Sequence, residues 1–268
     1  MLRVCSFESR RAAEMQSLIE RHGGVATIAP SLKEIPIEDN SAALAFGDQL
    51  RLGEIDIVVF LTGVGAQGLL DVLTTQNSTE EIQSWFARTT VVVRGPKPVA
   101  ILRQAGIQVD HRAAEPNTWR EVVQLIDNTP IPLAGQTVAV QEYGQPQLEL
   151  TKALQDRLAT VIAVPVYKWD LPDDIGPLEQ SVRSTIAGAF DVLLFTSAQQ
   201  AVNVIEIAGR LGMKDTWLEA AGKCIIGSIG PTATETLDSL GLHPHLEPSH
   251  GKMGHLVMET LAFAKSCH

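Results

Sequence analysis

Short apolar runs alternate with amphipathic stretches along the whole chain. The apolar runs are rich in Val and Ile, as buried parallel strands are, and they predict strands at Leu2–Cys5, Val25–Ile28, Ile57–Leu61, Thr90–Val93, Thr137–Val140, Val161–Val164, Val192–Phe195 and Lys223–Ile226. The stretches between them have apolar positions at helical spacing, and they predict helices at Arg10–His22, Ser41–Arg51, Gly65–Leu73, Lys97–Ala105, Leu148–Arg157, Ala198–Leu211 and Thr232–Leu240. This alternation indicates an α/β fold of open parallel sheets with helices on both faces.

The pattern repeats along the chain at an offset of 135 residues. The matching pairs include Asp56 and Asp191, Phe60 and Phe195, Ala66 and Ala201, Gly95 and Gly230, and Leu102 and Leu237. A repeat of this length is too long for a solenoid unit and fits a small domain, so we expect two similar lobes. Asn117 and Ser249 precede the last helix of each repeat and are expected to cap it.

Two proline-bounded segments interrupt the alternation and indicate how the lobes are connected. Ala29–Pro36 and its repeat partner Val164–Pro172 fit poorly as helices and are interpreted as extended connectors. A chain that leaves one lobe at the first connector and returns at the second forms one continuous and one discontinuous lobe. We therefore predict a discontinuous lobe of residues 1–35 and 171–268, a continuous lobe of residues 37–168, and a two-stranded connector.

The composition excludes several classes of function. With 268 residues, of which 45% are hydrophobic, the chain can bury two cores of ordinary size. No apolar window reaches the length of a membrane span, and the N-terminus lacks a secretory signal, so we expect a cytoplasmic protein that does not bind membranes. The formal net charge of -10 opposes binding to nucleic acid. Cys5, Cys224 and Cys267 have no metal or redox spacing, and the first two are expected in the core.

Small polar residues follow the predicted strands, where ligands bind in open parallel sheets. Thr62 and Gly63 come after the strand that ends at Leu61, and Ser197 and Ala198 stand at the equivalent place in the second repeat. A hydroxyl at the start of a helix can cap it, and the free backbone N–H groups there attract carboxylates or phosphates. Each hydroxyl is therefore either a plain cap or part of an anion-binding site.

A second pair of strand-end turns is rich in glycine and proline. Gly95 opens one turn, and Gly230, Pro231 and Thr232 form the other. Glycine lets the backbone approach a ligand, and proline suits the first turn of a helix. Neither turn matches a phosphate-binding loop or a dinucleotide fingerprint, so the sequence does not support nucleotide binding.

Tyrosine supplies the remaining candidate chemistry. Tyr143 and Gly144 follow the first strand of the second repeat, and Tyr167 lies in the second connector. Tyr167 is either a proton donor to a ligand or an aromatic residue that packs near Trp169. The histidines show no metal-ligand spacing and no G-x-S-x-G turn is present, so neither a metal site nor a hydrolytic triad is expected.

The order and spacing of four short motifs resemble the uroporphyrinogen-III synthase family over essentially the whole chain. These motifs are Pro165-Val-Tyr167, Phe195-Thr-Ser197, Ile229-Gly-Pro-Thr232 and Glu247-Pro-Ser249. The resemblance implies two α/β lobes that face each other across a cleft and are joined by two antiparallel connector strands. It also implies an enzyme without a cofactor, which closes the linear tetrapyrrole hydroxymethylbilane into uroporphyrinogen III and inverts the last pyrrole ring, ring D.

The resemblance assigns roles to individual residues and implies a cyclising hydro-lyase. Tyr167 is the expected general acid for departure of the terminal hydroxyl. The expected substrate-binding residues are Thr62, Gly63, Gly95, Tyr143, Gly144, Ser197, Ala198, Gly230, Pro231 and Thr232. We expect a monomer whose partner is the tetrapyrrole, with room for transient contact with the preceding enzyme of the pathway.

Three departures from the family pattern keep a second interpretation open. The chain has Phe7-Glu-Ser-Arg-Arg11 where an Arg-Pro is frequent, Pro98 and Val99 after the turn at Gly95, and Glu142-Tyr-Gly144 in place of an arginine-glycine. These changes reduce the expected cationic contacts. The alternative is a non-catalytic regulatory module of the same fold that binds a tetrapyrrole or another anion.

Overall fold

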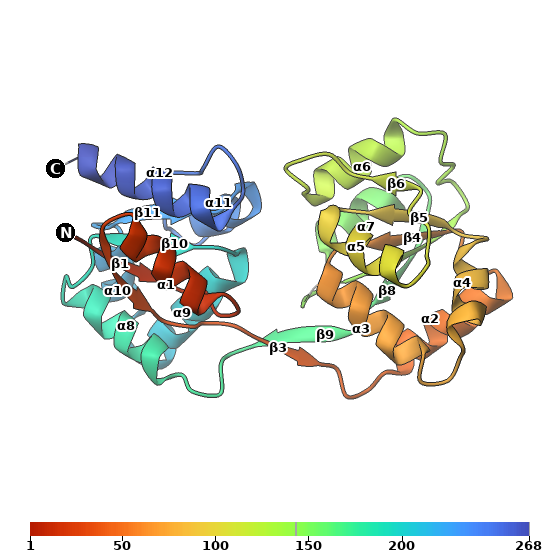
Figure 1. Ribbon diagram of the computed structural model, residues 1–268, viewed down its shortest axis with the longest axis horizontal. Helices are drawn as coiled ribbons and strands as arrows, with labels where there is room; N and C mark the ends of the chain where they lie inside the picture. The colour runs from red at the N-terminus through yellow and green to blue at the C-terminus, as the bar shows by residue number, and fades with distance from the viewer. Residues whose placement is uncertain (143, 268) are drawn as a thin grey trace. The chain divides into compact units, whose positions relative to one another are not determined.

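Figure 1 shows the computed structural model of the chain, which describes residues 1–142 and 144–267. The chain divides into two compact units. The first unit comprises Met1–Lys33 and Asp170–His268, and the second unit comprises Glu34–Trp169. The second unit is therefore one continuous segment, and the first unit is assembled from the two ends of the chain.

The first unit contains a four-stranded parallel sheet in the order β11-β10-β1-β2. Its strands are β1 (Leu2–Ser6), β2 (Gly24–Ile28), β10 (Val192–Phe195) and β11 (Ile225–Ser228). Val4 and Leu194 pack on one face against two helices, α1 (Ala12–Arg21) and α12 (Met253–Ser266). Cys5 and Phe195 pack on the other face. The helices on that face are α8 (Gly176–Ile186), α9 (Ala198–Arg210), α10 (Lys214–Ala221) and α11 (Pro231–Ser239).

The second unit contains a five-stranded parallel sheet in the order β6-β5-β4-β7-β8. Its strands are β4 (Ile57–Phe60), β5 (Thr90–Val93), β6 (His111–Arg112), β7 (Thr137–Gln141) and β8 (Thr160–Val164). Phe60 and Val91 face a core formed with α2 (Ser41–Leu52), α3 (Gly63–Leu73), α4 (Thr79–Phe86) and α5 (Pro96–Gln104). Val59 and Val92 face the opposite core, formed with α6 (Trp119–Asp127) and α7 (Leu148–Gln155).

The two connectors pair with each other. Strands β3 (Lys33–Pro36) and β9 (Tyr167–Asp170) form a separate two-stranded sheet, visible side by side in Figure 1. They lie within the segments Ala29–Pro36 and Val164–Pro172, which the prolines identified as extended. The predicted α/β class, the parallel sheets with helices on both faces and the two-stranded connector are confirmed.

Both predicted helix caps are wrong. Asn117 has a left-handed φ of 61°, and the next residue, Thr118, caps α6 in a capping box with Glu121. Ser249 lies three residues before Lys252, the residue at the N-cap of α12. A polar residue near a helix start is therefore an insufficient signal when its backbone conformation is unknown.

The sequence repeat is also a structural repeat, and it is shared between the units. Strands β4 and β10, β5 and β11, and β1 and β7, and helices α5 and α11, have bounds 135 residues apart. The order β5-β4-β7-β8 in the second unit corresponds to β11-β10-β1-β2 in the first. The first repeat supplies β1 and β2 to the first unit but β4 and β5 to the second. Each unit is therefore built from one part of each sequence repeat.

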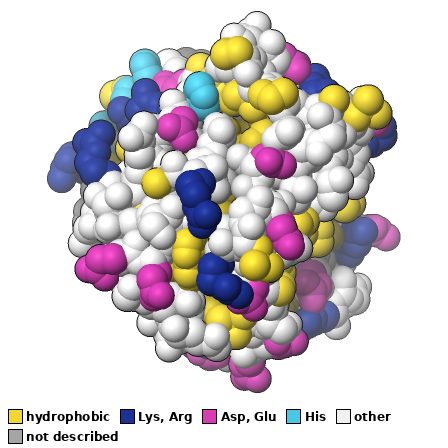
Figure 2. All heavy atoms as spheres, turned by 90° about the vertical axis from the view of Figure 1, so that its right-hand side faces the viewer, with side chains coloured by type: hydrophobic (Ala, Val, Ile, Leu, Met, Phe, Trp, Pro, Cys, Tyr) yellow, Lys and Arg dark blue, Asp and Glu magenta, His cyan; other side chains and the backbone are white. Residues whose placement is uncertain are grey.

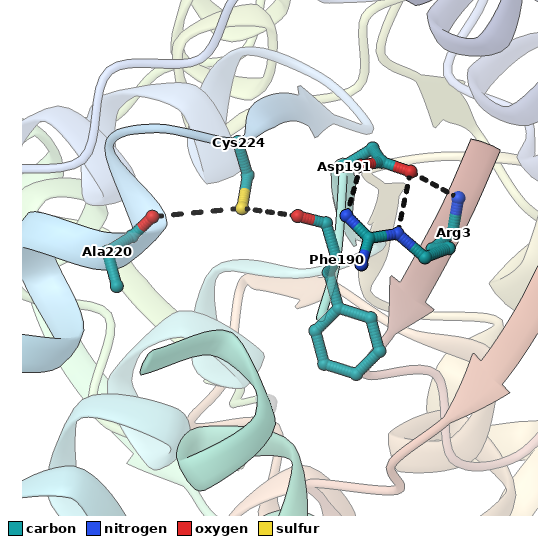
Figure 3. Close-up of polar contacts among 5 residues, drawn as sticks. All are labelled: Arg3, Phe190, Asp191, Ala220 and Cys224. Atoms are coloured by element: carbon teal, nitrogen blue, oxygen red, sulfur yellow. Dashed lines mark hydrogen bonds and ion pairs between the residues drawn. The ribbon is translucent and has the colours of Figure 1, made fainter. Parts of the chain in front are cut away.

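The repeated aspartates fix the start of a central strand in each unit. The Oδ2 atom of Asp191 accepts the backbone N–H of Arg3 at 2.7 Å, and its Oδ1 binds the guanidinium of Arg3 at 2.6 Å (Figure 3). In the second unit, Oδ2 of Asp56 accepts the backbone N–H of Thr137 at 2.8 Å. Each carboxylate thus ties a central strand to its neighbour, β10 to β1 and β4 to β7, and has a structural role.

The two cysteines expected in the core are buried. Cys224 donates its thiol to the carbonyl oxygen of Phe190 at 3.3 Å (Figure 3), and burial raises its pKa to about 11. Burial also raises the pKa of the Cys5 thiol. Both side chains therefore stay protonated and act as small apolar residues of the first unit.

The surface carries charges of both signs. Figure 2 shows a face of the second unit on which acidic and basic side chains are interspersed, with apolar side chains between them. The net charge of -10 is therefore not gathered into a single acidic field on this face. In the described part of the chain, no helix combines the length and apolar character needed to cross a bilayer.

Candidate functional site

The second unit brings Thr62 and Tyr167 together at the carboxyl end of β4. Thr62 is the N-cap of α3, and its Oγ1 accepts the backbone N–H of Gly65 at 3.0 Å. The same oxygen lies 3.2 Å from the hydroxyl of Tyr167, which belongs to β9 and is 7% exposed. The backbone N–H of Thr62 donates to Oε1 of Gln141 at 3.3 Å, so the turn is held from three directions.

This pair of hydroxyls is suited to proton transfer. Because Thr62 already accepts the N–H of Gly65, its own proton can be donated to the oxygen of Tyr167. In that arrangement the hydroxyl proton of Tyr167 points away from Thr62.

The adjacent turn in the second unit is closely packed around two glycines. Gly95 is the N-cap of α5, and a β-carbon added there would lie 3.2 Å from Oδ1 of Asn117. A β-carbon added to Gly63 would lie 3.2 Å from Lys97. Both glycines therefore allow neighbouring residues to pack closely against the backbone near the N-terminus of α5, where partial positive charge attracts anions.

Gly144 positions the strand that carries Tyr167. It has a left-handed φ of 74°, and a β-carbon added to it would lie 2.2 Å from the indole of Trp169. Its carbonyl accepts the backbone N–H of Trp169 at 3.3 Å. Gly144 is therefore required by both its conformation and its contact with β9. The predicted site residue Tyr143 lies outside the described residues.

In the first unit, Ser197 differs from its repeat partner Thr62. Ser197 is the N-cap of α9 and precedes Ala198, but its side chain accepts no hydrogen bond from the helix. Its Oγ is buried and has no hydrogen-bond partner among the described residues. A buried hydroxyl without a partner is destabilising, so the hydrogen-bonding capacity of this oxygen is left unused by the described residues.

The second turn of the first unit is open. Gly230 is extended, with φ 168°, and no atom lies within 4 Å of a β-carbon added there. Pro231 begins α11, and Thr232 follows it as an exposed residue. The N-terminus of α11 is therefore accessible to a ligand, in contrast to the packed turn at Gly95.

Sequence reasoning missed a polar cluster at the carboxyl ends of β1 and β10. Glu8 is 9% exposed, and its carboxylate accepts the backbone N–H of Arg11 at 3.0 Å and the hydroxyl of Thr196. Gln200 exchanges hydrogen bonds of 2.7 Å with the backbone N–H and the hydroxyl of Thr196. Glu8 occupies the repeat position of Tyr143, and that correspondence was the available signal.

A second missed carboxylate is Glu142, directly after β7. Its side chain is 8% exposed, and Oε1 accepts the backbone N–H of Gln147 at 3.2 Å. Burial raises the pKa of the Glu142 carboxyl, and the hydrogen bond from Gln147 opposes this shift. The group therefore retains a proton to higher pH than an ordinary glutamate does. No cluster of three or more metal-ligating side chains occurs in the part of the chain that the structure describes.

These features define a two-unit α/β protein whose strand ends carry hydroxyls, glycines and helix N-termini, which are groups that can bind anions. Residues 13–258 match the family model described as Uroporphyrinogen-III synthase HemD, and the chain belongs to this family. This result confirms the resemblance drawn from the sequence motifs.

Individual relatives are distant in sequence but similar in length. The chain is 24% identical over 261 residues to the uncharacterized protein YjjA of Bacillus subtilis, covering 96% of this chain and 94% of that protein. It is 26% identical over 218 residues to the uroporphyrinogen-III synthase of Synechococcus elongatus, covering 80% and 74% of the two chains.

Solved structures share the fold. A mutant uroporphyrinogen III synthase from Thermus thermophilus matches with a TM-score of 0.75 at 20% identity over 100% of both chains. The uroporphyrinogen-III synthetase of Helicobacter pylori matches with a TM-score of 0.53 at 13% identity, covering 98% of this chain and 100% of that one. At these identities the comparison establishes the architecture alone.

Proposed function

We propose that this protein is a uroporphyrinogen-III synthase, a cyclising lyase that converts hydroxymethylbilane into uroporphyrinogen III. Membership of the family supports the reaction class. The observation that carries the proposal is the hydrogen-bonded pair of Thr62 and Tyr167, which lies where ligands bind in parallel sheets.

The first chemical step is loss of the terminal hydroxyl of the substrate. Tyr167 transfers its phenolic proton to that hydroxyl, which departs as water while the pyrrole nitrogen supplies electrons, so that a phenolate and a protonated azafulvene form. Thr62 donates to the phenolate oxygen during this step. General acid catalysis of this kind contributes about 10²- to 10⁴-fold. The substituted carbon of ring D then attacks, and the resulting spiro intermediate reopens and closes with that ring inverted.

Substrate conformation is the second requirement, because the linear tetrapyrrole also cyclises without inversion. Four helices, α3, α5, α9 and α11, begin directly after strands, two in each unit. The free N–H groups at these helix N-termini can each bind a carboxylate of the substrate. Such contacts fix the position of ring D while the chain closes.

The proposal is tested by supplying enzymatically generated hydroxymethylbilane and separating the type I and type III isomers after oxidation. The type III isomer is expected with the protein and the type I isomer without it. Formation of the type I isomer alone, with tetrapyrrole binding retained, would instead support the non-catalytic module.

A further inference from the structure

The second unit has a cavity of about 390 Å³ that none of the proposed substrate-binding residues lines. Helix α5 contributes Val99 and Arg103, which lie four residues apart on one side of the helix. The extended chain after the helix contributes the other walls: Ile107, Gln108, Val109, Asp110, His111 and Arg112. A volume of about 300 to 1,000 Å³ is usual for a small-molecule site.

The apolar residues that line this cavity are held in place. Val99 and Val109 pack against the core of the second unit, and Ile107 is 4% exposed within it. The extended chain is fixed to the sheet because the backbone N–H of Asp110 donates to the carbonyl oxygen of Val91 at 3.0 Å. Strand β6 continues that attachment along β5. The walls are therefore already arranged for a ligand.

Three of the residues that line the cavity have unpaired basic side chains. Arg103, His111 and Arg112 form no side-chain hydrogen bond or ion pair with any residue between 1 and 267 that the structure describes. The one acidic residue, Asp110, is already engaged: its Oδ2 accepts the backbone N–H of Val91 at 2.8 Å, and its Oδ1 accepts Nε2 of Gln108 at 3.2 Å.

The two arginines that line the cavity differ from the ion-paired arginines elsewhere in the chain. Arginines that form ion pairs with carboxylates include Arg3, Arg11, Arg51, Arg157 and Arg210. The chain has 31 acidic and 21 basic residues, so partners are in excess. The two unpaired arginines that line this cavity are therefore available to bind an external anion.

We propose that this cavity binds a small organic anion with an apolar body and a carboxylate headgroup. The body lies against Val99, Ile107 and Val109, and the headgroup binds Arg103 and Arg112, whose guanidinium groups match carboxylate geometry. Binding of such a ligand does not depend on the proposed synthase activity.

Three probes test the contribution of each part of the cavity: 1-naphthoate, its uncharged analogue 1-naphthylmethanol, and acetate. Methyl NMR spectra of the full chain, labelled at Val, Ile and Leu, report binding at Val99, Ile107 and Val109. We expect 1-naphthoate to shift these methyl signals and to bind at least about 10-fold more tightly than the other two probes. Absence of shifts at these three residues up to the solubility limit of 1-naphthoate overturns the proposal.

Charge-matched variants test the arginines. Arg103→Gln and Arg112→Gln are each expected to weaken 1-naphthoate binding about 10-fold or more, because each removes a charged hydrogen bond. Arg21→Gln removes the same charge from an exposed position on α1 and is expected to bind like the parent protein. Equal weakening in all three variants, or equal affinity for 1-naphthoate and 1-naphthylmethanol, contradicts a specific anion site.

Discussion

Gly65→Ala is predicted to destabilise the second unit, because Gly65 makes room for the Gln141 carboxamide. A β-carbon at position 65 would lie 1.8 Å from Nε2 and 2.2 Å from Cδ of Gln141. Gln141 is fully buried and holds the backbone N–H of Thr62 and the carbonyl of Glu142, so it cannot move into solvent.

The expected loss follows from opposing terms. Replacing glycine by alanine inside a helix gains about 1 kcal/mol. Overpacking costs about 1–3 kcal/mol, and each displaced buried hydrogen bond costs about 1–3 kcal/mol more. With one such hydrogen bond displaced, the net decrease in the free energy of unfolding is about 1–5 kcal/mol. Gly68→Ala in the same helix is the matched control, since its nearest neighbour is Val166 at 3.6 Å, and it should raise stability slightly.

Urea unfolding followed by tryptophan fluorescence is a suitable assay, because Trp85, Trp119 and Trp169 lie in the second unit and only Trp217 lies in the first. Gly65→Ala with stability equal to that of Gly68→Ala would refute the packing argument.

The first unit suggests a compensating substitution for a larger side chain at position 65. At the repeat positions it has Gln200 in place of Gly65 and Ser6 in place of Gln141, and Oε1 of Gln200 accepts the backbone N–H of Thr196 at 2.7 Å. The double variant Gly65→Gln with Gln141→Ser should therefore be more stable than Gly65→Gln alone. Strictly additive effects would show that the two positions are not coupled.

Three further predictions concern the site. Tyr167→Phe is expected to lower turnover of hydroxymethylbilane by roughly 10²-fold while product affinity changes far less, as kinetics and titration will show; unchanged turnover would exclude Tyr167 as the acid. Ser197→Ala should raise KM without lowering the free energy of unfolding, because the buried hydroxyl has no partner among the described residues; a large loss of stability would contradict this. Because burial raises the folded-state pKa of Glu142 above its ordinary value of 4.5, wild-type stability falls as pH rises through that pKa. Glu142→Gln should be more stable than wild type at about pH 8 in urea unfolding, with a difference that shrinks as pH falls toward about 4; a constant difference would refute it.

The fold was largely predictable because its signals are local. Val-rich runs such as Ile57–Phe60 and the helices between them are visible in the sequence, and the offset of 135 residues identifies equivalent elements. The predicted end of β11 is two residues too early, since the strand ends at Ser228. The sequence did not indicate these two residues because Gly and Ser are weak strand formers. Asn117 failed as a cap because its left-handed backbone is set by the preceding turn.

The sequence could identify individual candidate residues of the site, but it could not predict which residues form hydrogen bonds with each other. Thr62 and Tyr167 could each be identified as candidates, yet they are 105 residues apart and only the folded chain shows their hydrogen bond. The role of Gln141 depends on a glycine in another element, and that of Glu8 depends on Thr196 across the sheet. Pairings of this kind have no local signature.

The central claim concerns ring inversion, and the ratio of isomers measures it directly. Uncatalysed closure gives the type I isomer at a rate that does not depend on the protein. At a fixed supply of hydroxymethylbilane, the ratio of type III to type I product should therefore rise in proportion to the concentration of the chain, and Tyr167→Phe should need a roughly 10²-fold higher concentration for the same ratio. A ratio that stays at the uncatalysed value at every concentration would contradict the account.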